Sequence, residues 1–353
     1  MSQYWSRAIK NIEPYTPGEQ PQGRKFIKLN TNENPYPPSP LVIEAIKRAT
    51  NDSLRLYPDP YAEELRTTIA GYYGLNNDQV FVGNGSDELL AFAFLAFFDP
   101  EEHILFPDVT YSFYPVYSAL FRINYELIPL NDDFTIPVQM FEKKNGGVIF
   151  PNPNAPTGIC LDCREIETIL ENNMKNVVVV DEAYIDFGGE SALKLLGKYR
   201  NLLIIRTLSK SRSLAGMRIG FALAHKDLIE GLDRVKSSFN SYTLDRLALA
   251  AAKASFEDEA YFQETRSKII KTREKVLRRL IDLNFRVIPS KANFLFISHP
   301  AVPAVAIYQE LKARGILVRH FNKPRIDNFL RVSIGSDEEM DAFLRYISLI
   351  TLP

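Results

Sequence analysis

The fold is decided by the stretch Arg206-Thr-Leu-Ser-Lys210-Ser-Arg-Ser-Leu-Ala-Gly-Met-Arg218-Ile-Gly220. The apolar run just before it, residues 202–205, predicts a buried strand. That strand delivers Lys210 into a segment rich in hydroxyls, arginines and glycine, at the end where open α/β sheets hold their ligands. From these residues alone, Lys210 could bind a phosphate, form a Schiff base or be an ordinary surface cation.

A second apolar run, Val177-Val-Val-Val180, predicts another buried strand, and it ends on Asp181-Glu-Ala-Tyr184. Parallel strands end at the same edge of a sheet, so this acidic strand end and the basic one at Lys210 should lie together. The two strands therefore predict one site with an anionic side and a cationic side.

Length and composition fit a globular enzyme. Of the 353 residues, 46% are hydrophobic and 24% are charged, which is enough apolar material for one large domain and a smaller one. The formal net charge is −1 and there is no polybasic run, so we expect neither nucleic acid nor a membrane as partner. No apolar run approaches the roughly 18 residues of a membrane span, and the first residues lack the apolar core of a signal peptide, which predicts a cytoplasmic protein.

The two cysteines of the chain, Cys160 and Cys163, are separated by two residues. This spacing suits a redox pair or half of a zinc site. Because there is no second cysteine pair and the four histidines are scattered, we expect no metal.

Strand and helix patterns alternate through most of the chain. We expect strands at 79–82, 103–106, 122–128, 147–151, 177–180, 202–205 and 220–224, and helices at 41–49, 62–73, 89–98, 163–173, 258–284 and from Tyr111 and Asp227. This alternation predicts an α/β fold with a large, doubly wound, mostly parallel sheet. Shorter strands at 285–289, 294–298 and 315–319, with helices at 302–314 and 337–350, predict a small α+β part. We therefore divide the chain into an N-terminal arm at 1–40 that joins the small domain and the substrate site, a large domain at 41–280 and a small C-terminal domain at 281–353.

Two further segments predict anion binding. Gly83-Asn-Gly85-Ser86-Asp87 lies between a strand and a helix, where backbone N–H groups and the helix dipole favour an anion. A simple helix start with Ser86 or Asp87 as N-cap fits the same residues. In Phe329-Leu-Arg331-Val-Ser-Ile-Gly335, one arginine stands in an apolar strand, so Arg331 needs an anionic partner, either a structural carboxylate or a ligand.

The side chains at the predicted sheet edge match what pyridoxal phosphate (PLP) requires. This cofactor needs an amine for its aldehyde, a carboxylate for its pyridine nitrogen, a donor near its ring hydroxyl and a cup for its phosphate. Lys210 supplies the amine, Asp181 supplies the carboxylate, and Tyr184 is placed to reach the same ring. The phosphate cup would be formed by Ser86, Asp87, Ser209 and Arg218.

Taken as an ordered set, the motifs resemble those of the fold-type I PLP enzymes, and among these the family of histidinol-phosphate aminotransferases. The resemblance covers almost the whole chain. It rests on Leu29-Asn-Thr-Asn-Glu-Asn-Pro, Arg55-Leu-Tyr-Pro, Gly85-Ser-Asp-Glu, Pro-Thr-Gly158, Asp181-Glu-Ala-Tyr, Arg206-Thr-Leu-Ser-Lys210, Leu214-Ala-Gly-Met-Arg218 and Leu330-Arg331.

The resemblance implies a role for each matching residue. Lys210 is the Schiff-base lysine and the acid/base that moves a proton between the substrate and the cofactor. Asp181 pairs with the pyridinium nitrogen, Tyr184 with the ring hydroxyl, and Tyr111 stacks on the ring. The phosphate is held by Ser86, Asp87, Ser209, Arg218 and, from the neighbouring subunit of a homodimer, Tyr57.

The substrate side is implied in the same way. Arg331 binds an anionic group, which is the phosphate of histidinol phosphate in one half-reaction and a carboxylate of glutamate in the other. Arg319, Asn32 and Tyr15 line the same pocket. The implied reaction is transamination of L-histidinol phosphate with 2-oxoglutarate, in histidine biosynthesis.

One position departs from the family pattern. The family usually has asparagine directly before Pro-Thr-Gly, where this chain has Ala155. We expect Asn154, one residue earlier, to make the ring-hydroxyl contact if the turn shifts. Otherwise Tyr184 carries that contact alone.

Three other functions fit the same motifs. An aminotransferase for aromatic amino acids is the nearest, and a threonine-phosphate decarboxylase of the same fold is the second. The third is a PLP-binding regulator, but such proteins carry an added DNA-binding domain, for which we expect no room ahead of the arm.

Overall fold

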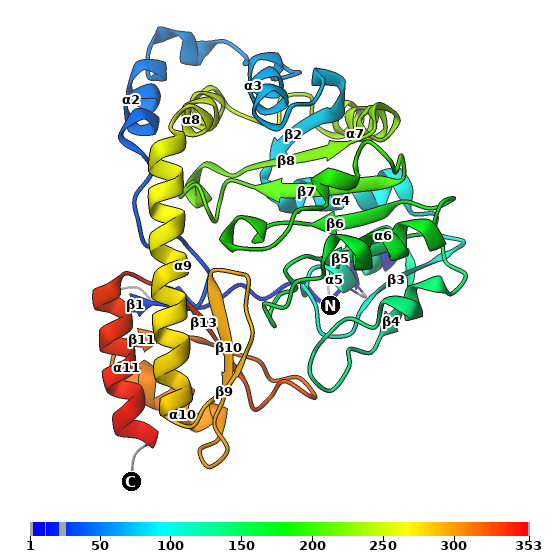
Figure 1. Ribbon diagram of the computed structural model, residues 1–353. Helices are drawn as coiled ribbons and strands as arrows, with labels where there is room; N and C mark the ends of the chain where they lie inside the picture. The colour runs from blue at the N-terminus through cyan, green and yellow to red at the C-terminus, as the bar shows by residue number, and fades with distance from the viewer. Residues whose placement is uncertain (1–2, 11, 21–25, 352–353) are drawn as a thin grey trace.

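The computed structural model describes residues 3–10, 12–20 and 26–351. Within these residues, no helix has the length and apolar character that crossing a membrane requires. Figure 1 shows a large sheet with helices around it and, beside it, a smaller group of strands joined to it by one long helix.

The large sheet has seven strands in the order β2-β8-β7-β6-β5-β3-β4. Every strand runs parallel to the others except β8, which is antiparallel to both of its neighbours. The mostly parallel sheet predicted from the sequence is therefore confirmed. The strands are β2 (Val80–Asn84), β3 (His103–Pro107), β4 (Asn124–Ile128), β5 (Val148–Pro151), β6 (Val178–Asp181), β7 (Leu202–Thr207) and β8 (Ile219–Ala224).

Helices cover both faces of this sheet, and side chains alternate between the two cores. In β7, Leu202 and Ile204 pack in one core, whereas Leu203 and Ile205 pack in the other, and all four are buried. The helices are α2 (Pro40–Ala49), α3 (Glu63–Tyr73), α4 (Gly85–Phe97), α5 (Tyr114–Phe121), α6 (Cys163–Asn172), α7 (Lys226–Phe239), α8 (Arg246–Glu257) and α9 (Glu259–Asp282). We did not predict α8, and α5 begins at Tyr114 rather than at Tyr111.

The C-terminal part has its own core. Four antiparallel strands in the order β12-β13-β10-β9 lie beside a parallel pair formed by β1 and β11, so the N-terminal arm joins this part. The predicted strand at 315–319 is two short strands. The elements are α1 (Arg7–Lys10), β1 (Ile27–Lys28), β9 (Arg286–Ile288), β10 (Phe294–Ser298), α10 (Ala304–Ala313), β11 (Ile316–Leu317), β12 (Arg319–His320), β13 (Leu330–Ser333) and α11 (Asp337–Thr351).

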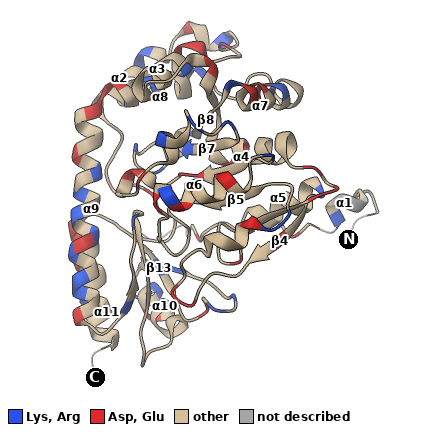
Figure 2. Ribbon diagram, turned by 45° about the vertical axis from the view of Figure 1, so that its right-hand side comes forward, with Lys and Arg blue, Asp and Glu red and all other residues tan. Residues whose placement is uncertain are grey.

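The long helix α9 connects the two parts, and the division of the chain at residues 40 and 280 stays a prediction. Figure 2 shows basic and acidic residues along α9. Some of them pair along the helix, as Lys268 does with Glu264, and Lys275 pairs with Asp341 of α11. The side chains in these pairs are exposed, so their charges face water.

Close backbone packing brings the start of α4 to the edge of the sheet. Gly85 has a φ of +77°, which glycine adopts without strain. A side chain at Gly220 would lie 2.5 Å from the carbonyl carbon of Gly85. Only glycine allows this approach, which sets the N-terminus of α4 against β8.

Candidate active site

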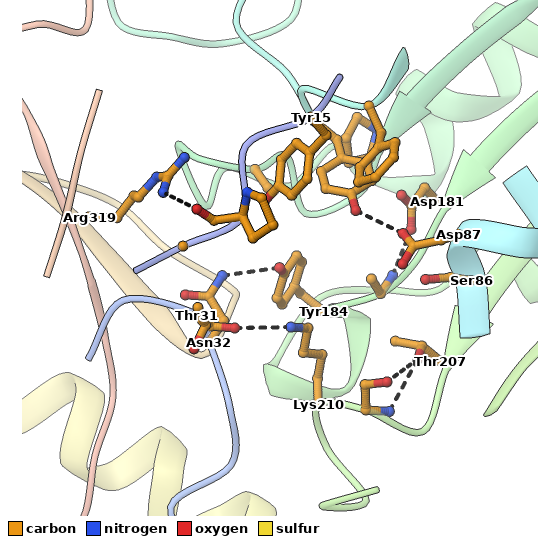
Figure 3. Close-up of a pocket in the computed structure, with 18 of the residues that line it drawn as sticks. Tyr15, Thr31, Asn32, Ser86, Asp87, Asp181, Tyr184, Thr207, Lys210 and Arg319 are labelled. Carbon is orange, nitrogen blue, oxygen red and sulfur yellow. Dashed lines mark hydrogen bonds between the residues drawn. The ribbon is translucent and has the colours of Figure 1, made fainter. Parts of the chain in front are cut away.

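A cavity of about 350 Å³ lies where the carboxyl ends of β6 and β7 meet the N-terminus of α4 and the C-terminal part. All of the predicted site residues line it except Tyr57 and Asn154. They are Tyr15, Asn32, Ser86, Asp87, Tyr111, Asp181, Tyr184, Ser209, Lys210, Arg218, Arg319 and Arg331. Figure 3 shows Asp181, Asp87, Ser86 and Thr207 on one side of this cavity and Arg319 on the other.

Lys210 presents its amine to the cavity. Its Nζ donates a hydrogen bond to the carbonyl of Thr31 (3.2 Å) and lies 5.7 Å from the centre of the Tyr184 ring. The amide of Asn34 donates to the carbonyl oxygen of Lys210 (3.0 Å), which fixes the backbone. No ion pair joins Lys210 to a carboxylate among residues 3–10, 12–20 and 26–351, so its amine is not engaged by a structural anion.

Asp181 is a buried carboxylate that faces the same cavity. It is 4% exposed and accepts hydrogen bonds from the Tyr114 hydroxyl (3.2 Å) and the Ala183 amide (3.2 Å). Burial raises the pKa of Asp181 to about 7. In the described part of the chain no cation pairs with it, so the site supplies an anion where a protonated ring nitrogen of a cofactor would be stabilised.

The end of the cavity at which we expect a phosphate to bind is formed by α4 and the loop before β8. Arg218 pairs with Asp87 (3.0 Å), and the Tyr111 hydroxyl donates to the other oxygen of the same carboxylate (2.8 Å). The Asp87 carboxylate, beside the guanidinium, is thereby held in place on the first turn of α4. The residue before this helix is Asn84, so the alternative that Ser86 or Asp87 is its N-cap is wrong.

Hydroxyl groups complete this end of the cavity. The Oγ atoms of Thr207 and Ser209 lie 2.9 Å apart, and the Ser209 amide donates to Thr207 (3.1 Å). Hydroxyls, a guanidinium and a helix N-terminus are the groups that bind phosphate in proteins.

Tyr184 is held by a residue of the N-terminal arm. The Asn32 amide donates to its hydroxyl (3.0 Å), and the Asn32 oxygen accepts from Ser333 of β13 (2.8 Å). The Tyr184 hydroxyl is therefore positioned by two segments that are far apart in the sequence.

Arg319 and Arg331 lie side by side on paired strands of the C-terminal part. Arg331 donates to the carbonyl of Asn30 (3.0 Å), and its buried Nε has no partner among the residues that the structure describes. Burial lowers the pKa of Arg331, and the charge of Arg319 lowers it further. No carboxylate pairs with either side chain in the part of the chain that the structure describes, so of the two partners expected for Arg331, a ligand fits better than a structural carboxylate.

Asn154 corrects one expectation. Its side chain is fully buried, and its amide donates to the carbonyl of Val109 (2.9 Å) and to the Thr157 hydroxyl (3.1 Å). The amide is thus held between its own turn and the segment after β3, and Asn154 does not line the cavity. Ala155 lines the cavity instead.

Tyr57 lies away from the cavity of its own chain. Its side chain is 77% exposed and its ring stacks on Tyr242 (4.5 Å between centres). Arg246 donates to the carbonyls of Leu56 (3.1 Å) and Tyr57 (2.5 Å), which fixes this loop. A contact of Tyr57 with a second subunit stays a prediction.

Several residues at the site were not predicted. Tyr114 touches Asp181, Phe113 stacks on Tyr15 (4.4 Å), and Thr31 accepts from Lys210. Tyr114 is the first residue of α5, and its contact with Asp181 depends on how that helix packs against the sheet. The backbone contact of Thr31 has no signal in the sequence.

The fold and the site together define a PLP-dependent transferase. The chain belongs to the class I and II aminotransferases, because the model of that family matches residues 24–347. Two curated relatives cover almost the whole chain, and both are histidinol-phosphate aminotransferases. The protein of Clostridium beijerinckii is 57% identical over 350 residues, 99% of this chain and 98% of its own length, and that of Clostridium acetobutylicum is 59% identical over 344 residues, 98% of each.

Solved structures agree on the fold. Histidinol-phosphate aminotransferase from Sinorhizobium meliloti, in complex with PLP, matches with a TM-score of 0.89 at 24% identity, over 99% of this chain and 98% of its own. Aspartate aminotransferase from Thermus thermophilus with maleate matches with a TM-score of 0.84 at 19% identity, over 99% of this chain and all of its own. Enzymes for different substrates share this fold, so the substrate must be inferred from the site.

Proposed function

We propose that this enzyme transfers the amino group of L-histidinol phosphate to 2-oxoglutarate, a step of histidine biosynthesis. One observation carries the proposal: the amine of Lys210 and the carboxylate of Asp181 face the same cavity as two arginines that pair with no carboxylate of the described chain. The names of the relatives at 57% and 59% identity support the same substrate.

The residues present fit PLP. Asp181, buried and without a cation among the described residues, would face the ring nitrogen, and Tyr184 would donate to the ring hydroxyl. Ser86, Ser209 and Arg218 would hold the phosphate beside the N-terminus of α4. When bound, PLP supplies an electron-withdrawing ring that stabilises the negative charge left when an amino acid loses its α-proton.

The protein moves the proton. Lys210 Nζ, which no carboxylate holds in the described residues, is the base that accepts the α-proton and returns it in the reverse half-reaction. Tyr111, half-buried and bonded to Asp87, would stack on the ring and exclude water from one side. Burial and the nearby Asp87 raise the pKa of Tyr111, which keeps it a neutral hydrogen-bond donor.

Arg319 and Arg331 would bind the substrate's anionic group. A phosphate or carboxylate between them would satisfy the buried Nε of Arg331 and screen the repulsion between the two cations. Tyr15 and Asn32 would line the same space. We also propose a cytoplasmic homodimer in which Tyr57, exposed on its own chain, reaches the phosphate in the other subunit.

A substrate panel tests the proposal. The purified enzyme, loaded with PLP, is given L-histidinol phosphate, phenylalanine or threonine phosphate, each with 2-oxoglutarate, and glutamate and carbon dioxide are measured. We expect glutamate formation with the highest kcat/KM for histidinol phosphate. Faster turnover of phenylalanine would favour an aromatic aminotransferase, and carbon dioxide from threonine phosphate would favour the decarboxylase.

A further inference from the structure

A buried ion pair lies behind the cavity, on the sheet face covered by α3. Arg206, four residues before Lys210, donates from Nε (2.9 Å) and Nη2 (2.7 Å) to one oxygen of Glu182. The two side chains are 8% and 0% exposed. The guanidinium also donates to the hydroxyls of Tyr73 (3.0 Å) and Ser191 (2.7 Å), so each of its three nitrogens has a hydrogen-bond partner. We call Arg206, Glu182 and Asp186, with these two hydroxyls, the Arg206 network.

The network touches the strand end that carries Asp181. Glu182 follows Asp181 directly, and its other oxygen accepts the amide of Ala192 (2.6 Å). Its own amide donates to the carbonyl of Ile205 in β7 (2.8 Å). The backbone next to Asp181 is therefore fixed by both side-chain and main-chain contacts.

The network also reaches the loop that carries Lys210. A second carboxylate, Asp186, lies 3.6 Å from Arg206 and accepts a hydrogen bond from the Ser211 hydroxyl (2.5 Å). Ser211 follows Lys210 directly, and its carbonyl accepts from Asn34 (3.2 Å). One guanidinium thus connects the residue after Asp181 with the residue after Lys210.

We propose that Arg206 is a positioning residue, which holds the two catalytic strand ends in fixed relation. Through Glu182 it orients Asp181, and through Asp186 and Ser211 it orients the loop of Lys210. Neither Arg206 nor Glu182 lines the cavity, so neither touches cofactor or substrate directly. This inference rests on the proposed roles of Asp181 and Lys210, and it adds the group that keeps them aligned.

The hydrogen bonds of the Arg206–Glu182 pair give a reason for having two charges at this buried position. A buried ion pair adds little stability compared with apolar side chains of similar size, whereas its hydrogen bonds fix direction and distance. An apolar replacement of both charges would therefore keep the fold and lose the alignment.

The test uses Arg206→Met/Glu182→Met, which leaves no uncompensated buried charge. The matched control is Arg66→Met/Asp233→Met, an ion pair of 3.2 Å with side chains 10% and 26% exposed, whose residues do not line the active-site cavity. We expect the Arg206/Glu182 variant to retain PLP binding and KM, and to lose about 100-fold in kcat, the scale expected for a displacement of about 1 Å. The control should retain kcat.

A second readout separates positioning from loss of structure. The visible absorbance of bound PLP is titrated with pH in both double variants, in Ser211→Ala and in Asp186→Asn. We expect a shifted titration and reduced kcat in the Arg206/Glu182 variant and, more weakly, in the two single variants, whose buried charge pair is intact. Unchanged kcat and titration in Ser211→Ala and Asp186→Asn would overturn the proposal even if the double variant does not fold. The titration needs no substrate, so it remains decisive if histidinol phosphate proves to be the wrong amino donor.

Discussion

The hydroxyl of Tyr114 donates to the carboxylate of Asp181 across 3.2 Å, and both side chains are buried. This contact favours the ionised carboxylate, whereas burial opposes it and raises the pKa of Asp181 to about 7. The cofactor-free enzyme therefore holds a carboxyl group whose charge is balanced near neutral pH. A protonated ring nitrogen would shift this balance toward the anion.

This balance predicts a pH dependence of stability. An unperturbed aspartate has a pKa of 3.8, so between about pH 4 and about pH 7 the folded protein keeps a proton that the unfolded chain has lost. The free energy of unfolding of the cofactor-free protein should therefore fall as pH rises through this range, by at most about 1.4 kcal/mol per pH unit from this group. Asp181→Asn, which has no carboxyl group to titrate, should remove this pH dependence of the free energy of unfolding.

The contribution of Asp181 to the free energy of unfolding is measured by urea unfolding of cofactor-free wild type and Asp181→Asn at pH 5 and pH 8. We expect the asparagine variant to gain stability relative to wild type at pH 8. In Tyr114→Phe the loss of stability should extend to higher pH, because a donor to the ionised form is gone. If the free energy of unfolding changed equally with pH in wild type and Asp181→Asn, the raised pKa of Asp181 would be contradicted.

Much of the site follows from the strand ends. The apolar runs before Asp181 and Lys210 predicted two parallel strands, and the structure places both residues at one cavity. Tyr114 and Thr31 were missed because their contacts depend on how α5 and the arm pack, which no local pattern encodes. Helix α8 was missed as well, although its sequence is rich in alanine, which favours a helix.

The contacts of Asn154 could not be predicted from the sequence motif alone. A neighbouring asparagine in sequence was expected to replace the missing one at Ala155, but the turn directs its amide to Val109 and Thr157. Asn154→Ala should destabilise the protein by about 1–3 kcal/mol, because a buried carbonyl loses its donor. Its PLP absorbance should match wild type, whereas that of Tyr184→Phe should shift. A changed spectrum in Asn154→Ala would restore the earlier assignment.

Arg331 should determine affinity for the anionic substrate. Arg331→Gln removes charge-assisted hydrogen bonds and should raise KM for histidinol phosphate about 10- to 100-fold, with PLP affinity unchanged. Arg325→Gln is the matched control, since Arg325 lies on the neighbouring loop and is already paired with Asp108 (2.6 Å). Equal KM changes in the two variants would show that Arg331 does not bind substrate.

The proposed role of Tyr57 predicts complementation between subunits. Lys210→Ala and Tyr57→Ala subunits are inactive or weak alone, yet a mixed dimer contains one site with both Lys210 and Tyr57 intact. We expect refolding the two variants together to restore activity above that of either. No gain on mixing, with mixed dimers detected by mass spectrometry, would place Tyr57 outside the partner's site.

Lys210 and Asp181, acting with bound PLP, are proposed to catalyse the transfer of the amino group from histidinol phosphate. The most direct measurement mixes PLP-loaded enzyme with L-histidinol phosphate, without an acceptor, and follows visible absorbance in a stopped-flow instrument. We predict that the visible absorbance band of bound PLP disappears within one turnover. Adding 2-oxoglutarate should restore this band with release of glutamate, and Lys210→Ala should show neither change. A band that stays unchanged with histidinol phosphate while phenylalanine removes it, or a Lys210→Ala variant that reacts at the wild-type rate, would contradict the claim.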